Sequence, residues 1–199
     1  MKNENINYIH FQDCFGKYIY SKETKLITFN DTIEFYISSA SNEFIQYLIS
    51  TILLENNIIR LWNNEAKIEK VEILKEPEFN EECEISTLSP ITVYSTFQNQ
   101  FRKKTYYYNP SEPEFYELTK QNLLKKYQAF YNEIPENNEF EMKSIGRYRE
   151  RFMIYKKDFI VKAYDGKFLI KGNPKLIKLA YEAGLASRNS AGFGMIKIN

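Results

Sequence analysis

The stretch "GLASRNSAGFGMIKIN" (residues 184–199) holds three of the seven glycines in a chain of 199 residues. Glycine adopts positive φ and permits close approach of other atoms, so this stretch predicts either a difficult turn or a close partner. The preceding "NPKLIKLAYEA" (173–183) predicts a short helix with Pro174 in its first turn and Gly184 at its end. "GFGMIKI" (192–198) predicts a closing strand. The glycines are therefore expected to connect the last helix to the last strand of a sheet.

The segments upstream of this stretch extend the pattern. "EISTLSPITVYS" (84–95) predicts a strand segment interrupted by proline, and "SEPEFYELTKQNLLKKYQAFYNEI" (111–134) predicts a long helix. "EFEMKSI" (139–145) and "RFMIYKKDFIVKAYDGKFLIKG" (151–172) predict further strands, with Asp165–Gly166 as a turn. With the last helix and strand, the order is strand, helix, strand, strand, helix, strand. This is the ferredoxin-like order.

The first part of the chain predicts a related but shorter unit. "GKYIYS" (16–21) and "TIEFYISS" (32–39) predict strands, and "AKIEKVEIL" (66–74) alternates as a strand does. Between them, "SNEFIQYLISTILLEN" (41–56) has apolar residues at helical spacing, with Ser41 or Asn42 as its N-cap. Only about fifteen residues precede this pattern, which is too few for an opening strand and helix of typical length.

These patterns predict an α+β protein with tandem ferredoxin-like (RRM-like) domains, the first incomplete at its N-terminus. The polar stretch "KEPEFNEEC" (75–83) predicts a linker, so the domains are expected to span residues 1–78 and 79–199.

The composition describes a globular protein with little overall charge. The net charge is +1, so any basic binding surface must come from local clustering. The two cysteines fit no metal-ligand spacing, and no cofactor or metal motif is present, so neither is expected. The polar N-terminus lacks the apolar run of a signal peptide, and a cytoplasmic location without membrane contact is expected.

The glycine-rich stretch, in this position, resembles the C-terminal signature of a known family. A Gly-apolar-Ala/Gly start, a short polar run and Gly-Phe-Gly-Met before a final strand are similar to the CRISPR-associated endoribonucleases that cut precursor guide RNA within its repeats, the sixth Cas family. "IIRLW" (58–62) and "TLSPITV" (87–93) agree in order and spacing, and the resemblance covers residues 6–199. Ala186 replaces a usual glycine, which is a mild change if its φ is negative. The family's first strand and its helix, which often carries a catalytic tyrosine, have no counterpart.

The resemblance implies that His10 and Lys17 are the catalytic pair. "NYIHFQDCFGKYIYS" (7–21) resembles the family segment in which a histidine ends a helix and a lysine precedes the next strand. Imidazole titrates near neutrality and suits a general base or a general acid, and a lysine can stabilise charge developing at a phosphate. The alternative for His10 is an ordinary surface or half-buried histidine, and for Lys17 a solubilising residue at a strand edge.

The same loop suggests where RNA is held. Its backbone N–H groups and polar side chains can contact phosphates, which is compatible with a purely structural role of the glycines as helix stop and strand entry. The loop residues expected to contact RNA are Gly184, Ser187, Arg188, Asn189, Ser190, Gly192, Phe193 and Gly194.

Two further basic stretches leave alternatives open. Arg147, Arg149 and Arg151 lie two apart, so one strand face could present them to phosphates. They could equally form a solvated edge beside Glu150. "RKKTYYY" (102–108) mixes basic and aromatic residues as single-strand RNA surfaces do, although cross-strand packing of the tyrosines is the favoured interpretation.

The sequence therefore predicts a metal-independent endoribonuclease that cleaves CRISPR repeat RNA by attack of the 2′-hydroxyl. The alternatives are a repeat-RNA-binding protein that does not cleave, and a tandem ferredoxin-like interaction module without an RNA role. The expected partner is repeat RNA, and a CRISPR effector complex and a second copy of the chain are further candidates.

Overall fold

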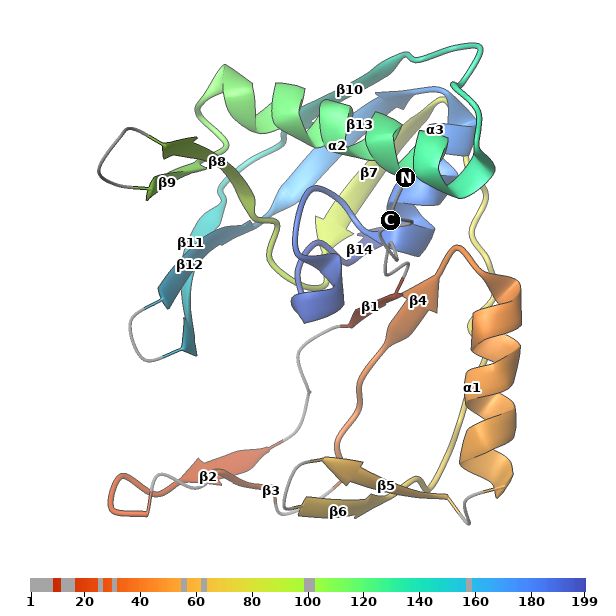
Figure 1. Ribbon diagram of the computed structural model, residues 1–199, viewed down its shortest axis with the longest axis vertical. Coiled ribbons are helices and arrows are strands. Elements are labelled where there is room, and N and C mark those ends of the chain that lie inside the picture. The colour runs from red at the N-terminus through yellow and green to blue at the C-terminus, as the bar shows by residue number, and fades with distance from the viewer. Residues whose placement is uncertain are drawn as a thin grey trace.

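The computed structural model describes residues 9–11, 17–24, 27–29, 32–54, 57–61, 64–98, 103–156 and 159–199. Figure 1 shows that the elements from β7 onward gather around one sheet, and that the earlier elements lie to one side of it. The chain is an α+β protein, as the sequence predicts.

The later elements form the predicted ferredoxin-like arrangement. Its strands run in the order β10-β13-β7-β14 with antiparallel neighbours, so the first strand lies inside the sheet, between the third and fourth. The elements are β7 (Glu82–Thr87), α2 (Pro113–Tyr131), β10 (Phe140–Ser144), β13 (Lys167–Gly172), α3 (Pro174–Ala183) and β14 (Ile196–Ile198). The predicted strand–helix–strand–strand–helix–strand order is confirmed.

Two hairpins interrupt this order. β8 (Val93–Gln98) pairs with β9 (Lys103–Tyr108), and β11 (Arg149–Lys156) pairs with β12 (Phe159–Asp165). The predicted proline interruption is confirmed, because the chain leaves β7 before Pro90 and enters a different sheet at β8. The prediction of a turn at Asp165–Gly166 as in a hairpin is wrong. β12 pairs with the preceding strand β11, whereas β13 pairs with β7 and β10. Asp165 and Gly166 therefore connect two different sheets.

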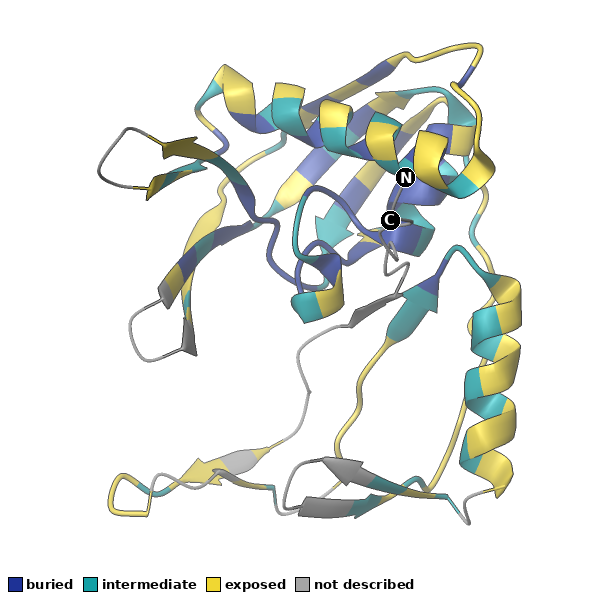
Figure 2. Ribbon diagram, in the orientation of Figure 1, coloured by how far each residue is buried: buried dark blue, intermediate teal, exposed yellow. Residues whose placement is uncertain are grey.

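The core lies between this sheet and the two helices. Figure 2 shows the buried positions concentrated on the sheet, the inner faces of α2 and α3, and the loop before β14. α3 buries Leu176, Ile177, Leu179, Ala180 and Ala183. It begins as predicted, with Pro174 in its first turn and the Asn173 side chain accepting a hydrogen bond from the Lys175 N–H at 2.9 Å.

The earlier elements form short two-stranded pairs. β1 (Ile9–Phe11) pairs with β4 (Ile37–Ser39), β2 (Tyr18–Tyr20) with β3 (Ile27–Phe29), and β5 (Ile58–Leu61) with β6 (Asn64–Lys67). Helix α1 spans Asn42–Leu54. The Ser41 hydroxyl accepts a hydrogen bond from the Phe44 N–H at 3.2 Å, which confirms Ser41 as its N-cap.

The predicted strand at residues 66–74 is wrong beyond Lys67. Residues 68–80 form no strand, and Ile73 is 80% exposed. The alternating pattern arises in a connector that runs toward α3 instead of pairing with a strand. Its Glu76 forms an ion pair with Lys178, and the Phe79 ring lies 5.6 Å from the Tyr181 ring. The domain boundary at residues 78 and 79, which falls in this connector, stays a prediction.

No helix in the described part of the chain is long and apolar enough to cross a membrane.

Candidate functional site

The glycine-rich loop (residues 184–195) has an unusual backbone. It joins α3 to β14 through the short 3-10 helix η1 (Asn189–Ala191). Five of its residues have positive φ, namely Gly184 at 76°, Ala186 at 54°, Arg188 at 61°, Gly192 at 92° and Gly194 at 81°. The glycines are therefore needed for the course of the chain, and Gly184 ends α3 as predicted.

Ala186 departs from the expectation that its φ is negative. Its φ of 54° lies in the left-handed region, where a β-carbon costs about 1–2 kcal/mol. Its side chain is buried, so packing of the methyl group offsets part of that cost. Replacing the family's usual glycine is thus a strained substitution that the loop tolerates.

The segment between β7 and β8 holds the loop in place. The N–H groups of Leu88 and Ser89 donate to the Met195 carbonyl at 2.8 and 3.1 Å, and the Ser89 hydroxyl accepts from the Met195 N–H at 2.9 Å. The Gly194 N–H donates to the Pro90 carbonyl at 2.9 Å, and the Ser187 N–H to that of Thr92 at 3.2 Å. Residues of the "TLSPITV" segment (87–93), which was singled out in the sequence, therefore hold the loop mainly through backbone hydrogen bonds.

Inside the loop, Asn189 links the loop to helix α2. Its amide donates to the carbonyls of Leu185 at 3.0 Å and Phe193 at 2.9 Å, and its Oδ1 accepts from Lys126 Nζ at 2.7 Å. The same ammonium also donates to the carbonyls of Gly184 at 2.6 Å, Ala186 at 3.0 Å and Ala183 at 3.4 Å. Lys126 therefore caps the C-terminal end of α3 and fixes the loop to helix α2.

The environment of Lys126 is strongly desolvated at its charged end. Burial lowers the pKa of the Lys126 ammonium to about 7. The surrounding oxygens act against this shift, because they bind the ammonium. Sequence reasoning missed this residue, since it lies 63 positions from Asn189 on a helix with two other lysines.

Four of the predicted RNA contacts are buried, namely Gly184, Asn189, Phe193 and Gly194. Asn189 is 7% exposed and Phe193 is 2% exposed, with Phe193 packed against Val161 and Ala163 of β12. Both side chains shape the loop from inside because their neighbours enclose them. Direct contact with RNA stays a prediction, for which Ser187, Arg188, Ser190 and Gly192 are the accessible candidates. The backbone of Gly194 is already engaged, because its N–H donates to the Pro90 carbonyl at 2.9 Å.

Arg188 lies against the first inserted hairpin. Its guanidinium is 4.9 Å from the centre of the Tyr94 ring. Tyr94 and Tyr107 are partners across β8 and β9, with rings 5.7 Å apart, and the Tyr106 ring lies 4.9 Å from that of Tyr108. The favoured cross-strand packing is confirmed for Tyr107, whereas Tyr106 and Tyr108 contact each other along β9.

The predicted catalytic residues lie on different elements. His10 is in β1, where it pairs with Ser38, and β1 lies against η1 of the glycine-rich loop. The expectation that His10 ends a helix is wrong, because residues 9–11 pair with β4; the side chain of His10 lies outside the described part of the structure. Lys17 is exposed and directly precedes β2, which lies away from the loop (Figure 1).

The arginine stripe is only partly a strand feature. Arg149 and Arg151 are in β11, whereas Arg147 precedes the strand, next to Gly146 with its positive φ. The Arg151 side chain donates to Asp165 at 2.5 Å across the hairpin. One arginine therefore already has a carboxylate partner, which fits the alternative of a solvated edge. Phosphate contact by the stripe stays a prediction.

Comparison with known proteins agrees with this geometry. The family described as "CRISPR associated protein Cas6, C-terminal" matches residues 74–198. The chain is 39% identical over 163 residues to CRISPR-associated endoribonuclease Cas6 1 of Methanocaldococcus jannaschii, covering 81% of this chain and 61% of that protein. It is 34% identical over 164 residues to CRISPR-associated endoribonuclease Cas6 of Pyrococcus furiosus, covering 82% and 60%.

Solved structures give the same result. A structure described as a Cas6-related gene from Pyrococcus furiosus superimposes with a TM-score of 0.84 at 25% identity, covering 96% of this chain and 78% of the other. One described as CRISPR associated protein Cas6 gives a TM-score of 0.82 at 33% identity, covering 98% and 80%. The fold and the loop define a tandem ferredoxin-like protein of the CRISPR-associated class. The chain belongs to the Cas6 family, and spans about three fifths of the length of these two curated relatives.

Proposed function

We propose that this chain acts as a metal-independent endoribonuclease that cleaves CRISPR repeat RNA within precursor transcripts, in the cytoplasm. The observation that carries this proposal is the position of β1, the strand of the chain's only histidine, against η1 in the glycine-rich loop. The loop has accessible polar side chains at Ser187, Arg188 and Ser190, and side chains of this kind can hold a phosphate. We propose that the imidazole of His10, carried by β1, moves a proton at the same phosphate.

The chemistry requires few groups. Attack of a ribose 2′-hydroxyl on the adjacent phosphate needs a base for that proton, an acid for the leaving 5′-oxygen and a cation near the phosphorane. His10 is proposed for one of the two proton transfers. Lys17 is proposed as the electrostatic stabiliser, which requires the segment that carries it to approach the loop when RNA binds.

Cleavage of a cognate repeat RNA tests the proposal. The expected result is a single cut that persists in excess EDTA and leaves a 2′,3′-cyclic phosphate, while a substrate with one 2′-deoxy sugar at the cut site binds but stays intact. Cutting of the deoxy substrate, or loss of all cutting in EDTA, would overturn the mechanism.

Variants test the assigned residues. His10→Ala should lower the single-turnover rate by about 10²–10⁴-fold, the usual size of one general acid or base. Lys17→Ala should lower it about 10²-fold, as loss of one transition-state contact does. Lys22→Ala is the matched control, since Lys22 is an exposed lysine in the turn after β2. Equal rates for Lys17→Ala and Lys22→Ala would remove Lys17 from the site.

A further inference from the structure

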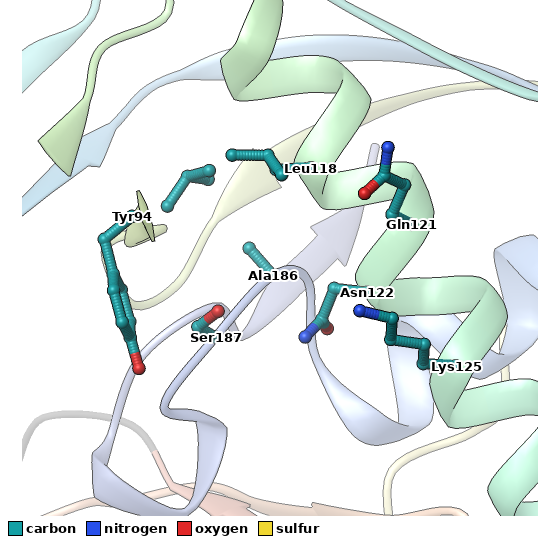
Figure 3. Close-up of a pocket in the computed structure, with 8 residues that line it drawn as sticks. Tyr94, Leu118, Gln121, Asn122, Lys125, Ala186 and Ser187 are labelled. Carbon is teal, nitrogen blue, oxygen red and sulfur yellow. The ribbon is translucent and has the colours of Figure 1, made fainter. Parts of the chain in front are cut away.

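A small cavity lies beside the glycine-rich loop, between the loop, β8 and α2. Its volume is about 230 Å³. Pockets that bind drug-sized ligands are larger, at about 300–1,000 Å³. Figure 3 shows Tyr94 on one side, Asn122 and Lys125 of α2 on the other, and Ala186 and Ser187 of the loop between them. The cavity therefore has room for one small, flat group.

One side of the cavity is apolar and aromatic, whereas Gln121, Asn122, Lys125 and Ser187 make the rest of its lining polar. Tyr94 supplies an aromatic side chain, and Leu118 and Ala186 add aliphatic surface. Tyr94 is half-buried and fixed by its neighbours, because the Tyr107 ring and the Arg188 guanidinium both lie against it. A fixed aromatic wall suits a nucleobase, since every base has a π-face and an apolar body.

The cavity also has an acceptor that needs a donor. Asn122 Oδ1 is buried and has no hydrogen-bond partner among the described residues. A buried acceptor without a partner is destabilising. Such a group therefore indicates a ligand that donates a hydrogen bond to it. Figure 3 shows the Asn122 and Lys125 side chains both directed toward the loop at Ala186 and Ser187. Lys125 is exposed, and no described carboxylate pairs with it.

We infer that this cavity binds one unpaired nucleobase that carries an exocyclic amino group, with Lys125 on the phosphate of the same nucleotide. The amino N–H projects from the rim of the base and can donate to Asn122 Oδ1. Uracil fits less well, because its single N–H lies between two carbonyl oxygens that would face the amide oxygen. The inference rests on the proposed function for the source of the nucleotide, and gives that function a base-selective contact beside the loop.

Binding of mononucleotides to the complete chain tests the cavity directly. In ¹⁵N-¹H correlation spectra, 5′-AMP and 5′-CMP should shift the amides of Tyr94, Ala186 and Ser187, and 5′-UMP should require at least about fivefold more nucleotide for the same shift. Asn122→Leu should abolish the difference between AMP and UMP. Gln128→Leu is the matched control, because Gln128 is an exposed amide on α2 outside the cavity.

Lys125 has its own comparison. Lys125→Met should weaken AMP severalfold but leave adenosine, which has no phosphate, unchanged. Melting temperatures of all variants show whether each is folded. UMP binding as well as AMP, or Asn122→Leu binding AMP with unchanged preference, would overturn the inference. The absence of shifts at the cavity would do the same.

The two proposals fail in different ways. A chain that binds AMP selectively at the cavity but does not cut repeat RNA would refute the proposed function and retain the base site. A chain that cuts repeat RNA but shows no selective AMP shifts would refute the base site and retain the function.

Discussion

Replacing Lys126 should show how strongly the glycine-rich loop depends on helix α2. In Lys126→Met the apolar stem is kept, but the ammonium that bonds to four oxygens is lost. Three of these oxygens, on Gly184, Ala186 and Asn189, lie within 3.0 Å of Nζ. They lose their donor in a place that water reaches poorly.

The magnitude follows from counting these acceptors. A buried acceptor without a partner costs about 1–3 kcal/mol. Three acceptors at the lower end of this range give about 3 kcal/mol. A typical domain has only about 5–15 kcal/mol of stability, so the variant should unfold at a clearly lower urea concentration.

Urea unfolding followed by circular dichroism at 222 nm measures this effect. Lys125→Met is the control, because it removes a neighbouring lysine of the same helix whose side chain is exposed. It should change the free energy of unfolding by no more than about 0.5 kcal/mol. Equal urea midpoints for the two variants would refute the conclusion that Lys126 holds the loop.

Three further predictions concern the same region. Burial lowers the pKa of the Lys126 ammonium from its ordinary value of 10.5 to about 7, so unfolding takes up a proton between these pH values. The free energy of unfolding of wild type minus that of Lys126→Met should then grow from pH 7 to 10, by at most about 1.4 kcal/mol per pH unit. Urea titrations in which this difference shrinks as the pH rises would contradict the prediction. Gly194→Ala should cost about 2–5 kcal/mol, because at φ 81° its β-carbon would collide with the Leu185 carbonyl oxygen. Gly146→Ala, with φ 94° and nothing within 4 Å, should cost only about 1–2 kcal/mol in the same urea assay, and equal costs would contradict the role of the contact. Ala186→Gly should be within about 1 kcal/mol of neutral, because relief of its positive φ offsets the lost methyl contacts and the added chain entropy. Ala183→Gly, in the last turn of α3, should lower the melting temperature, and a larger loss for Ala186→Gly would show that no strain is relieved.

The sequence predicted most features that depend on neighbouring residues. The cap of α1 at Ser41, the start of α3 at Pro174 and the break at Pro90 follow from local backbone chemistry. The strand–helix order then determined the sheet, because few arrangements satisfy it. The connector at residues 68–80 was misread because alternation alone does not say whether a strand finds a partner.

The site was harder to predict because its contacts are distant in sequence. Lys126 meets Asn189 only after the sheet has brought α2 and α3 together. His10 joins a strand through pairing with β4, for which its own neighbours carry no signal. The positive φ of Ala186 follows from hydrogen bonds of the loop to the segment around Thr92, so the residue type alone suggested the opposite sign.

The central position of β7 has a consequence for synthesis of the chain. Both of its neighbours, β13 and β14, lie far downstream, so a nascent chain presents both edges of β7 unpaired until most of the domain has been made. Such long-range pairing is slow to form, and open edges invite association with other nascent chains. Glu82 and Glu84 alternate with the buried Cys83 and Ile85. Like charges directly opposite one another destabilise a strand pair, so these glutamates disfavour pairing between two copies of β7 in unfinished chains.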